Sequence, residues 1–183
     1  GGSPGSTNSR ISLQLFPSAQ LSLTGRSTDG EAGHIMNSAS GAVIANTWYH
    51  LVGVNDLAAD TQAIYVNAVL NTSDPAAGFA AATTAATAVS CAALGAQDPA
   101  NADYMNGLIH DWRLYNRALS LAEIQTIYAA RGTDDIVYGL ELRYMLNEAP
   151  SGTLAAKDSS DTNRAVTNVG TPQYTTGSIL QIP

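Results

Sequence analysis

Hydrophobic and polar residues alternate with period two near the start of the chain. Residues 11–15 (ISLQL) and 21–24 (LSLT) both show this pattern, which is typical of a strand with one buried face. The intervening residues 16–20 (FPSAQ) contain proline and serine, which favour a turn. The pattern therefore predicts a β-hairpin over these residues.

Further apolar runs predict a second hairpin and one more strand. Residues 48–54 (WYHLVGV) are rich in β-branched and aromatic side chains, and residues 63–69 (AIYVNAV) follow after the polar segment 55–61. The Ala- and Thr-rich segment 75–93 has no charged residue to mark a solvent-facing side. We expect an extended strand in this region, over residues 85–94.

One helix interrupts the series of strands. A long strand predicted over residues 105–115 is followed by Ser120 and Glu123, which are spaced as in a capping box. Apolar residues then recur at helical spacing until Gly132, which favours a left-handed helix end. The sequence therefore predicts an all-β fold with one short helix at about residues 120–131.

Three segments form a combination with a fixed order and spacing. They are residues 48–54, residues 64–67 (IYVN) and residues 106–120 (NGLIHDWRLYNRALS), the last of which continues into Glu123 and Ile124. In this combination the chain resembles the laminin-G-like, concanavalin A-like jelly-roll family, whose final strand runs into a short helix. The resemblance implies an antiparallel two-sheet jelly-roll sandwich.

The segment that opens members of this family comes last in this chain. It corresponds to residues 140–152 (LELRYMLNEAPSG) and 157–160 (KDSS). We therefore expect a sandwich body over residues 1–138, with its front strands missing, and a C-terminal extension over residues 139–183. A missing or processed front segment, a circular permutation and strand donation to a neighbouring subunit all account for this order. We favour the first explanation, with an extension that packs on the body or on a neighbour.

Composition narrows the choice of partners. The 183 residues carry a net charge of −7, and the eight basic residues are scattered singly, which argues against nucleic acid as the main partner. There is no run of about 18 apolar residues, so we expect no membrane span. The single cysteine, Cys91, excludes a disulfide within the chain. Charged residues make up only 13% of the chain, which suits a protein in an assembly or outside a cell, or else reflects a habit of the source organism.

Glycoside hydrolases also occur on folds of this kind, so catalysis needs a direct test. Retaining enzymes need two carboxylates about 5 Å apart, usually from alternate positions of one strand. Asp134 and Asp135 are adjacent, and Glu141 and Glu148 are seven residues apart, so no such pair is present. The three histidines are far apart along the chain, and we expect structural roles for them. We therefore predict that the protein is not an enzyme.

Calcium is the usual ion of the family that the chain resembles, and oxygen ligands on rim loops hold it. Asp158, Asp161 and Asn163 lie in one loop (DSSDTN) and are candidate ligands, with Asp111 as a more distant contributor. In the other interpretation, these residues form turns and hydrogen-bond to their own backbone. The resemblance makes calcium possible, and the sequence indicates no other cofactor.

Carbohydrate binding would use exposed aromatic and amide side chains on rim loops. Tyr104, Tyr138, Tyr144 and Tyr174 are available, but each is equally compatible with a half-buried strand position. The spacing does not separate the two interpretations, so the sequence alone assigns no carbohydrate-binding residue.

Residues 131–140 and the tail that follows also resemble virion-associated proteins of tailed bacteriophages. We therefore predict a structural or decoration protein on the surface of a virus particle, with other virion proteins and copies of itself as partners. Its strand edges and the tail residues Leu142, Tyr144 and Leu146 would make the assembly contacts. The alternative is a secreted or cell-surface carbohydrate-binding module that binds glycans. Burial of the tail against another subunit would favour assembly, whereas a rim groove with aromatic residues would favour glycan binding.

Overall fold

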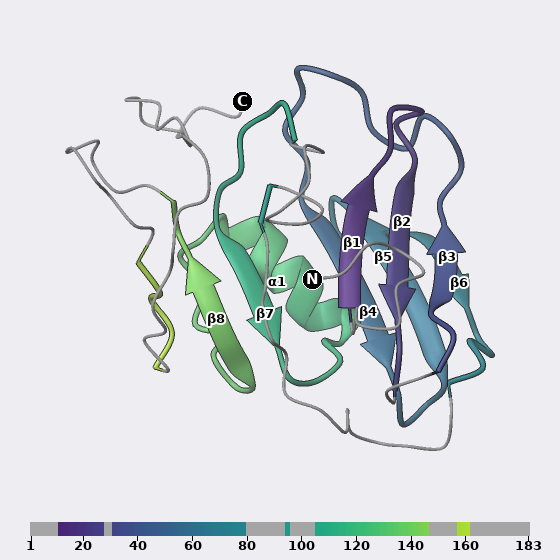
Figure 1. The fold of residues 1–183 in the computed structure, drawn as a ribbon. Helices are drawn as coiled ribbons and strands as arrows, with labels where there is room; N and C mark the ends of the chain where they lie inside the picture. Colours follow the sequence, from purple (N-terminus) through teal and green to yellow (C-terminus); the bar gives the residue numbers. More distant parts are fainter. Residues whose placement is uncertain (1–10, 28–30, 80–93, 96–104, 147–156, 162–183) are drawn as a thin grey trace. The chain divides into compact units, whose positions relative to one another are not determined.

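The computed structural model describes residues 11–27, 31–79, 94–95, 105–146 and 157–161. Over these residues the chain forms eight strands, all paired antiparallel, and one helix (Figure 1). This architecture confirms the predicted all-β fold with one short helix. The strand predicted over residues 85–94 falls almost entirely outside the described residues.

The chain divides into two compact units. The first contains Gly1–Met105 and Arg117–Asp134, and the second contains Asn106–Asn116 and Asp135–Pro183. Both units are therefore assembled from segments that are separated along the sequence.

The first unit contains two sheets, of which the first is built on the N-terminal hairpin. Its strands are β1 (Ile11–Leu15), β2 (Leu21–Gly25) and β3 (His34–Asn37), in the order β1-β2-β3. β1 and β2 form the predicted hairpin, with Leu13 directly opposite Leu23. In the turn, Ala19 adopts a φ of 56° and its amide donates to the Phe16 carbonyl at 2.9 Å. The alternation of apolar residues thus predicted this pair correctly.

The second sheet of this unit follows the next apolar runs. Its strands are β4 (Leu51–Asp56), β5 (Thr61–Val66) and β6 (Val69–Asp74), in the order β4-β5-β6. The predicted hairpin is confirmed as the β4–β5 pair, but β4 begins at Leu51 rather than at residue 48. The prediction of one strand over residues 63–69 was wrong at its end. Asn67 and Ala68 have φ values of 51° and 61°, so they form a two-residue turn and the chain reverses into β6.

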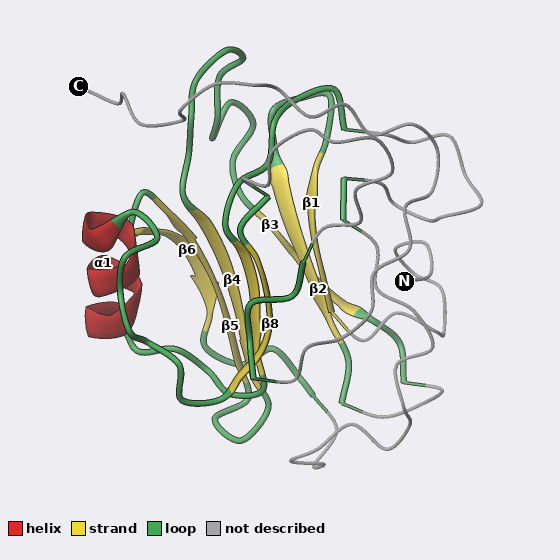
Figure 2. Ribbon diagram, turned by 90° about the vertical axis from the view of Figure 1, so that its left-hand side faces the viewer, coloured by secondary structure: helices red, strands yellow, loops and turns green. Residues whose placement is uncertain are grey.

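The two sheets of the first unit face each other across an apolar core. Leu21 and Leu23 of β2 and Ile64 of β5 are fully buried in this core. Gly53 of β4 permits the close approach, because a Cβ atom there would lie 2.7 Å from Cδ1 of Leu23. The facing sheets form the sandwich that the resemblance implied (Figure 2).

The helix α1 (Leu121–Ala130) lies on the outer side of the sheet that contains β4–β6 (Figure 2). Its capping box is confirmed: Ser120 Oγ accepts from the Glu123 amide at 3.3 Å, and the Ser120 amide donates to the Glu123 carboxylate at 2.8 Å. The helix ends at Arg131, whose φ of 49° breaks the helical hydrogen-bond pattern. In the described part of the chain, no helix has the length and apolarity that a membrane span requires.

The second unit contains the strands β7 (Trp112–Tyr115) and β8 (Leu140–Tyr144), which pair antiparallel. β7 is much shorter than the strand predicted over residues 105–115. Asp111 adopts a φ of 50°, which is not an extended conformation, so β7 begins only at Trp112. β8 is the segment that the resemblance assigns to the opening of the family's fold, and in this chain it pairs with β7.

Candidate functional site

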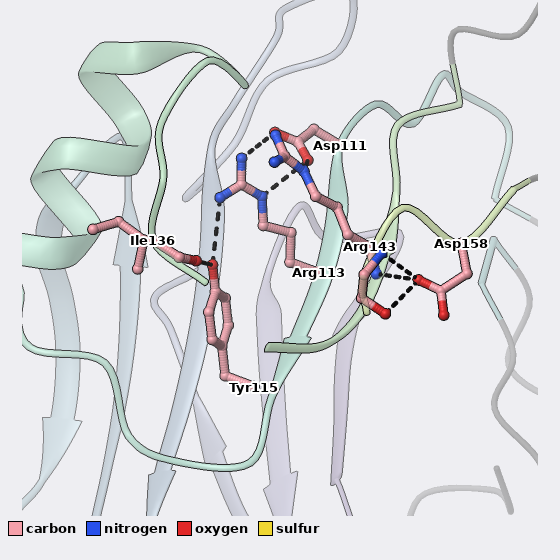
Figure 3. A network of polar contacts seen from close by, with 7 residues as sticks. Asp111, Arg113, Tyr115, Ile136, Arg143 and Asp158 are labelled. Carbon is pink, nitrogen blue, oxygen red and sulfur yellow. Dashed lines mark hydrogen bonds and ion pairs between the residues drawn. The ribbon is translucent and has the colours of Figure 1, made fainter. Parts of the chain in front are cut away.

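A carboxylate in the second unit lies between two arginines. The register of β7 and β8 places Arg113 directly opposite Arg143, and like charges in this position repel. Arg113 donates to both oxygens of Asp111, at 2.9 Å and 2.6 Å, and Arg143 Nε donates to Oδ1 at 3.0 Å (Figure 3). All three side chains are largely buried, with exposed fractions between 6% and 14%. Asp111 therefore offsets a repulsion that the strand register creates.

The environment of Asp111 changes its proton affinity. Burial alone would raise the pKa of this carboxyl group, because burial penalises the charged form. Hydrogen bonds from Arg113 and Arg143, together with their positive charges, outweigh that penalty and hold the pKa below its ordinary value. Asp111 is therefore ionised at neutral pH, as its contacts with two guanidinium groups require.

A short loop packs beside β8 through the carboxylate of Asp158. This side chain is buried, and its Oδ1 accepts from the Arg143 amide at 3.1 Å (Figure 3). The same oxygen accepts from the Ser160 amide at 2.9 Å and from Ser160 Oγ at 2.7 Å. The Ser159 amide donates to the Arg143 carbonyl at 2.7 Å. Asp158 thus fixes the loop against the strand, which is the backbone-bonding role that the sequence offered as the alternative to calcium binding.

A pocket of about 160 Å³ lies between this loop and the segment that leads into β8. Among the described residues, two aliphatic residues, two serines and one aspartate line it. The lining residues are Val137, Leu140, Ser159, Ser160 and Asp161.

An exposed aromatic ring follows one of the lining residues. Tyr138 comes directly after Val137 and is 80% exposed. Ligand sites commonly combine apolar and aromatic surface with a few polar groups that fix the ligand's orientation. The described lining combines aliphatic residues with residues that carry polar groups. Tyr138, which follows Val137 in the sequence, adds an exposed amphipathic ring.

The described residues do not fit the calcium site that the sequence suggested. An ion at Asp111 would have to displace two guanidinium groups, and Oδ1 of Asp158 already accepts three hydrogen bonds. Asp161 is exposed at the pocket, and Asn163 lies outside the described residues. Among the described residues, no three histidine, cysteine or acidic side chains are grouped so that they could hold a metal ion. Calcium therefore stays a prediction, confined to the loop around Asp161.

The residues predicted to make assembly contacts lie on or just after β8. Leu142 is 6% exposed and lies opposite Leu114. Tyr144 lies opposite Trp112, and the two rings stack with centroids 5.7 Å apart. Leu146 is half-buried just beyond the strand. Leu142 and Tyr144 thus contribute to strand pairing within one chain, and a role in assembly stays a prediction.

The histidines make separate contacts. In the first unit, His34 Nε2 lies 2.9 Å from the Glu31 carboxylate, and the ring of His50 stacks on Tyr128 with centroids 5.6 Å apart. His110 is half-buried in the second unit. These positions agree with the structural roles expected from the sequence.

Comparison with known families identifies the fold. Residues 2–125 match the laminin G type family model described as the concanavalin A-like lectin/glucanases superfamily, and the match covers more than half of the chain. The chain belongs to this superfamily. The resemblance inferred from residues 48–54, 64–67 and 106–120 is therefore confirmed at the level of the superfamily.

Two solved structures are similar to this superfamily member. One is described as a "putative carbohydrate binding protein" from Bacteroides ovatus ATCC 8483, with a TM-score of 0.58 and 16% identity over 86% of this chain and 43% of that chain. The other is an S-layer domain-containing protein from Clostridium thermocellum ATCC 27405, with a TM-score of 0.37 and 22% identity over 69% of this chain and 59% of that chain. The first likeness shows the fold, and the chain spans less than half of that structure. A search of curated proteins gave no match.

The sequence alone does not reveal the pocket. It singles out Asp161 as a possible metal ligand and Tyr138 as an available aromatic residue, but nothing in their spacing brings them together. Ser159 and Ser160 belong to the KDSS motif that marks the family's opening segment. Their proximity to Val137 arises only because the loop is bonded to β8, and a linear pattern does not contain that contact.

Proposed function

We propose that this superfamily member is a non-catalytic carbohydrate-binding module whose sugar site is the pocket of the second unit. The observation that carries the proposal is the mixed lining of that pocket, with the exposed Tyr138 adjacent to Val137 in the sequence. A sugar ring presents apolar C–H faces and a rim of hydroxyls, which aliphatic and aromatic side chains and polar groups contact respectively. The similar structure from Bacteroides ovatus is described as a protein of the same class.

The acidic residues of the site support binding without bond cleavage. Retaining and inverting glycosidases both need a pair of carboxyl groups on either side of the scissile bond. Among the described residues that line the pocket, Asp161 is the single acidic one. The carboxylates of Asp111 and Asp158 are occupied by arginine and by backbone donors. Because glycans are the proposed ligands, the proposal places the protein outside a cell or on a surface.

Binding to a glycan array, followed by calorimetry on the ligands that bind, tests the proposal. We expect Tyr138→Ala to weaken binding about tenfold, because the proposal has this exposed ring contact the sugar, and truncation of an aromatic contact removes more than about 1 kcal/mol. Tyr128→Ala is the matched control, since Tyr128 is a partly exposed tyrosine on α1 in the first unit. Failure of the wild-type chain to bind any glycan would overturn the proposal.

Removing metal ions with EDTA tests whether sugar binding depends on calcium. Because the described carboxylates at Asp111 and Asp158 are already occupied, we expect glycan affinity to be unchanged in EDTA. Calorimetry with and without 1 mM calcium, roughly the range of extracellular sites, gives the comparison. Loss of binding in EDTA and recovery with calcium would show instead that the loop around Asp161 holds an ion.

A second candidate is the structural role on a virus particle, with other virion proteins and copies of the chain as partners. The observation that favours it is on β1, an outer strand of its sheet among the described strands. Its alternate residues Ile11, Leu13 and Leu15 are 45%, 36% and 49% exposed, and exposed apolar strand edges promote pairing between chains. Light scattering on the purified chain distinguishes the two: a mass of 19.0 kDa, the monomer, would contradict self-assembly.

A further inference from the structure

A buried side chain next to the pocket determines where part of its lining lies. Three of the five described lining residues, Ser159, Ser160 and Asp161, follow Asp158 directly in the sequence. Asp158 is 3% exposed and does not itself line the pocket. The pocket therefore depends on how this loop is held beside β8.

Several contacts between the loop and β8 meet at one carboxylate oxygen. Oδ1 of Asp158 accepts from the backbone amide of Arg143, at 3.1 Å, and from the amide and hydroxyl of Ser160. A neighbouring strand would offer a backbone carbonyl to the Arg143 amide, so the carboxylate takes the place of a strand carbonyl. The Ser159 amide adds a bond to the Arg143 carbonyl at 2.7 Å, and Ser160 Oγ lies 3.1 Å from the Glu141 carbonyl.

We infer that Asp158 is the positioning residue of the sugar site: its Oδ1 holds the loop on β8 and so places Ser159, Ser160 and Asp161 at the pocket. The inference rests on the proposed function and names a residue that acts on the ligand only through its neighbours. The three donors to Oδ1 are two backbone amides and a hydroxyl, all of them neutral. The place of the acceptor therefore matters more than its charge.

Three substitutions separate the place of the acceptor from its charge. Asp158→Asn keeps an oxygen acceptor on a side chain of the same length, Asp158→Glu keeps the charge but moves the oxygens by one methylene, and Asp158→Ala removes the acceptor. We expect sugar affinity within about threefold of wild type for Asp158→Asn, and a loss of about tenfold or more for the other two. A tenfold loss corresponds to a loop that is correctly placed in about a tenth of the molecules. Calorimetry with a glycan that the wild-type chain binds measures each affinity.

Asp111→Asn is the matched control for general destabilisation. Asp111 also binds Arg143, but through the guanidinium Nε at 3.0 Å and not through the backbone amide. The substitution therefore weakens the second unit without removing the acceptor that holds the loop. We expect its sugar affinity to stay within about threefold of wild type, under conditions in which urea denaturation shows the variant to be folded.

A second measurement follows the loop without any sugar. Lys157 is exposed and is the single lysine of the chain, so a lysine-specific protease cuts at one bond, directly before Asp158. Asp158 is buried, so cleavage requires the loop to leave β8. We expect Asp158→Ala and Asp158→Glu to be cut about tenfold faster than wild type or more, and Asp158→Asn and Asp111→Asn to stay within about threefold of it.

The order of the variants decides the inference. Retained binding and slow cleavage in Asp158→Asn, with loss of both in Asp158→Ala and Asp158→Glu, support it. Better binding by Asp158→Glu than by Asp158→Asn would show that negative charge acts there, as in an ion ligand, and would overturn it. Equal losses in Asp158→Asn and Asp158→Ala, or wild-type affinity in Asp158→Ala, overturn it as well.

The control and the fold of the variants complete the comparison. A loss in Asp111→Asn as large as that in Asp158→Ala would mean that affinity follows stability in general, and this too overturns the inference. If Asp158→Ala does not fold, the order of Asp158→Asn and Asp158→Glu decides. If the wild-type chain binds no glycan, the proposed function fails, and the cleavage rates still show whether Asp158 holds the loop on β8.

Discussion

At the scale of single residues, Asp111 has the most consequential contacts of the second unit. It is the partner that lets Arg113 and Arg143 lie opposite each other on β7 and β8. Its position in the sequence suggested an ion ligand instead. That interpretation lacked one fact, the register of two strands separated by more than twenty residues, and register depends on the folded pairing rather than on local spacing.

Neutralising Asp111 should destabilise the chain. We expect Asp111→Asn to lower the free energy of unfolding by about 2 kcal/mol, because hydrogen bonds to charged groups are lost and the two arginines repel. Urea denaturation monitored by tryptophan fluorescence measures the change, since Trp112 lies next to the site. Asp135→Asn, an exposed change of the same charge, should stay within about 0.5 kcal/mol of wild type. Equal stability of the two variants would contradict the role assigned to Asp111.

The helix cap gives a prediction about pH. The Arg117 guanidinium, followed by the Ser120 amide and hydroxyl, lowers the pKa of Glu123 to about 2. In the unfolded chain the pKa of a glutamate is about 4.3. The stabilisation from the cap is therefore fully present above that pH and is lost as the pH falls toward 2. An NMR titration of the Glu123 carboxyl should show this low pKa, and Arg117→Ala should raise it. An unshifted titration in the wild-type chain would contradict the cap geometry.

At the scale of elements, local patterns predicted what is local. Period-two alternation located β1 and β2, and the spacing of Ser120 and Glu123 located the start of α1. The turn at Asn67 and Ala68 was missed because no glycine marks it, so β5 and β6 merged into one predicted strand. Asparagine, which tolerates positive φ, was the available signal there.

The facing of the two sheets in the first unit can be tested at Gly53. A methyl group at this position would meet Leu23, so we expect Gly53→Ala to destabilise the chain by about 1–3 kcal/mol. A double-mutant cycle with Leu23→Ala isolates the contact, because the penalty of Gly53→Ala should fall when the leucine is shortened. Strictly additive effects would mean that the two residues do not meet across the sandwich.

At the scale of the whole molecule, a lectin-like fold is combined with a C-terminal segment that supplies β8 and the wall of the pocket. The segments 48–54, 64–67 and 106–120 were enough to identify the superfamily, because their order and spacing are preserved over much of the chain. The pocket could not be predicted in the same way, since Val137 and Ser159 meet only after the Asp158 loop bonds to β8. Leu142 and Tyr144 pair with β7, a contact that depends on the register of two strands far apart in the sequence, and their role in assembly stays a prediction.

The most direct test of the central claim is an NMR titration of the isotopically labelled chain with the tightest-binding oligosaccharide from the glycan array. The account predicts saturable shifts of backbone amides at Val137, Tyr138 and Leu140 and at the loop residues Ser159, Ser160 and Asp161. Shifts confined to residues of the first unit, or changes that never saturate, would contradict the assignment of the pocket as the sugar site.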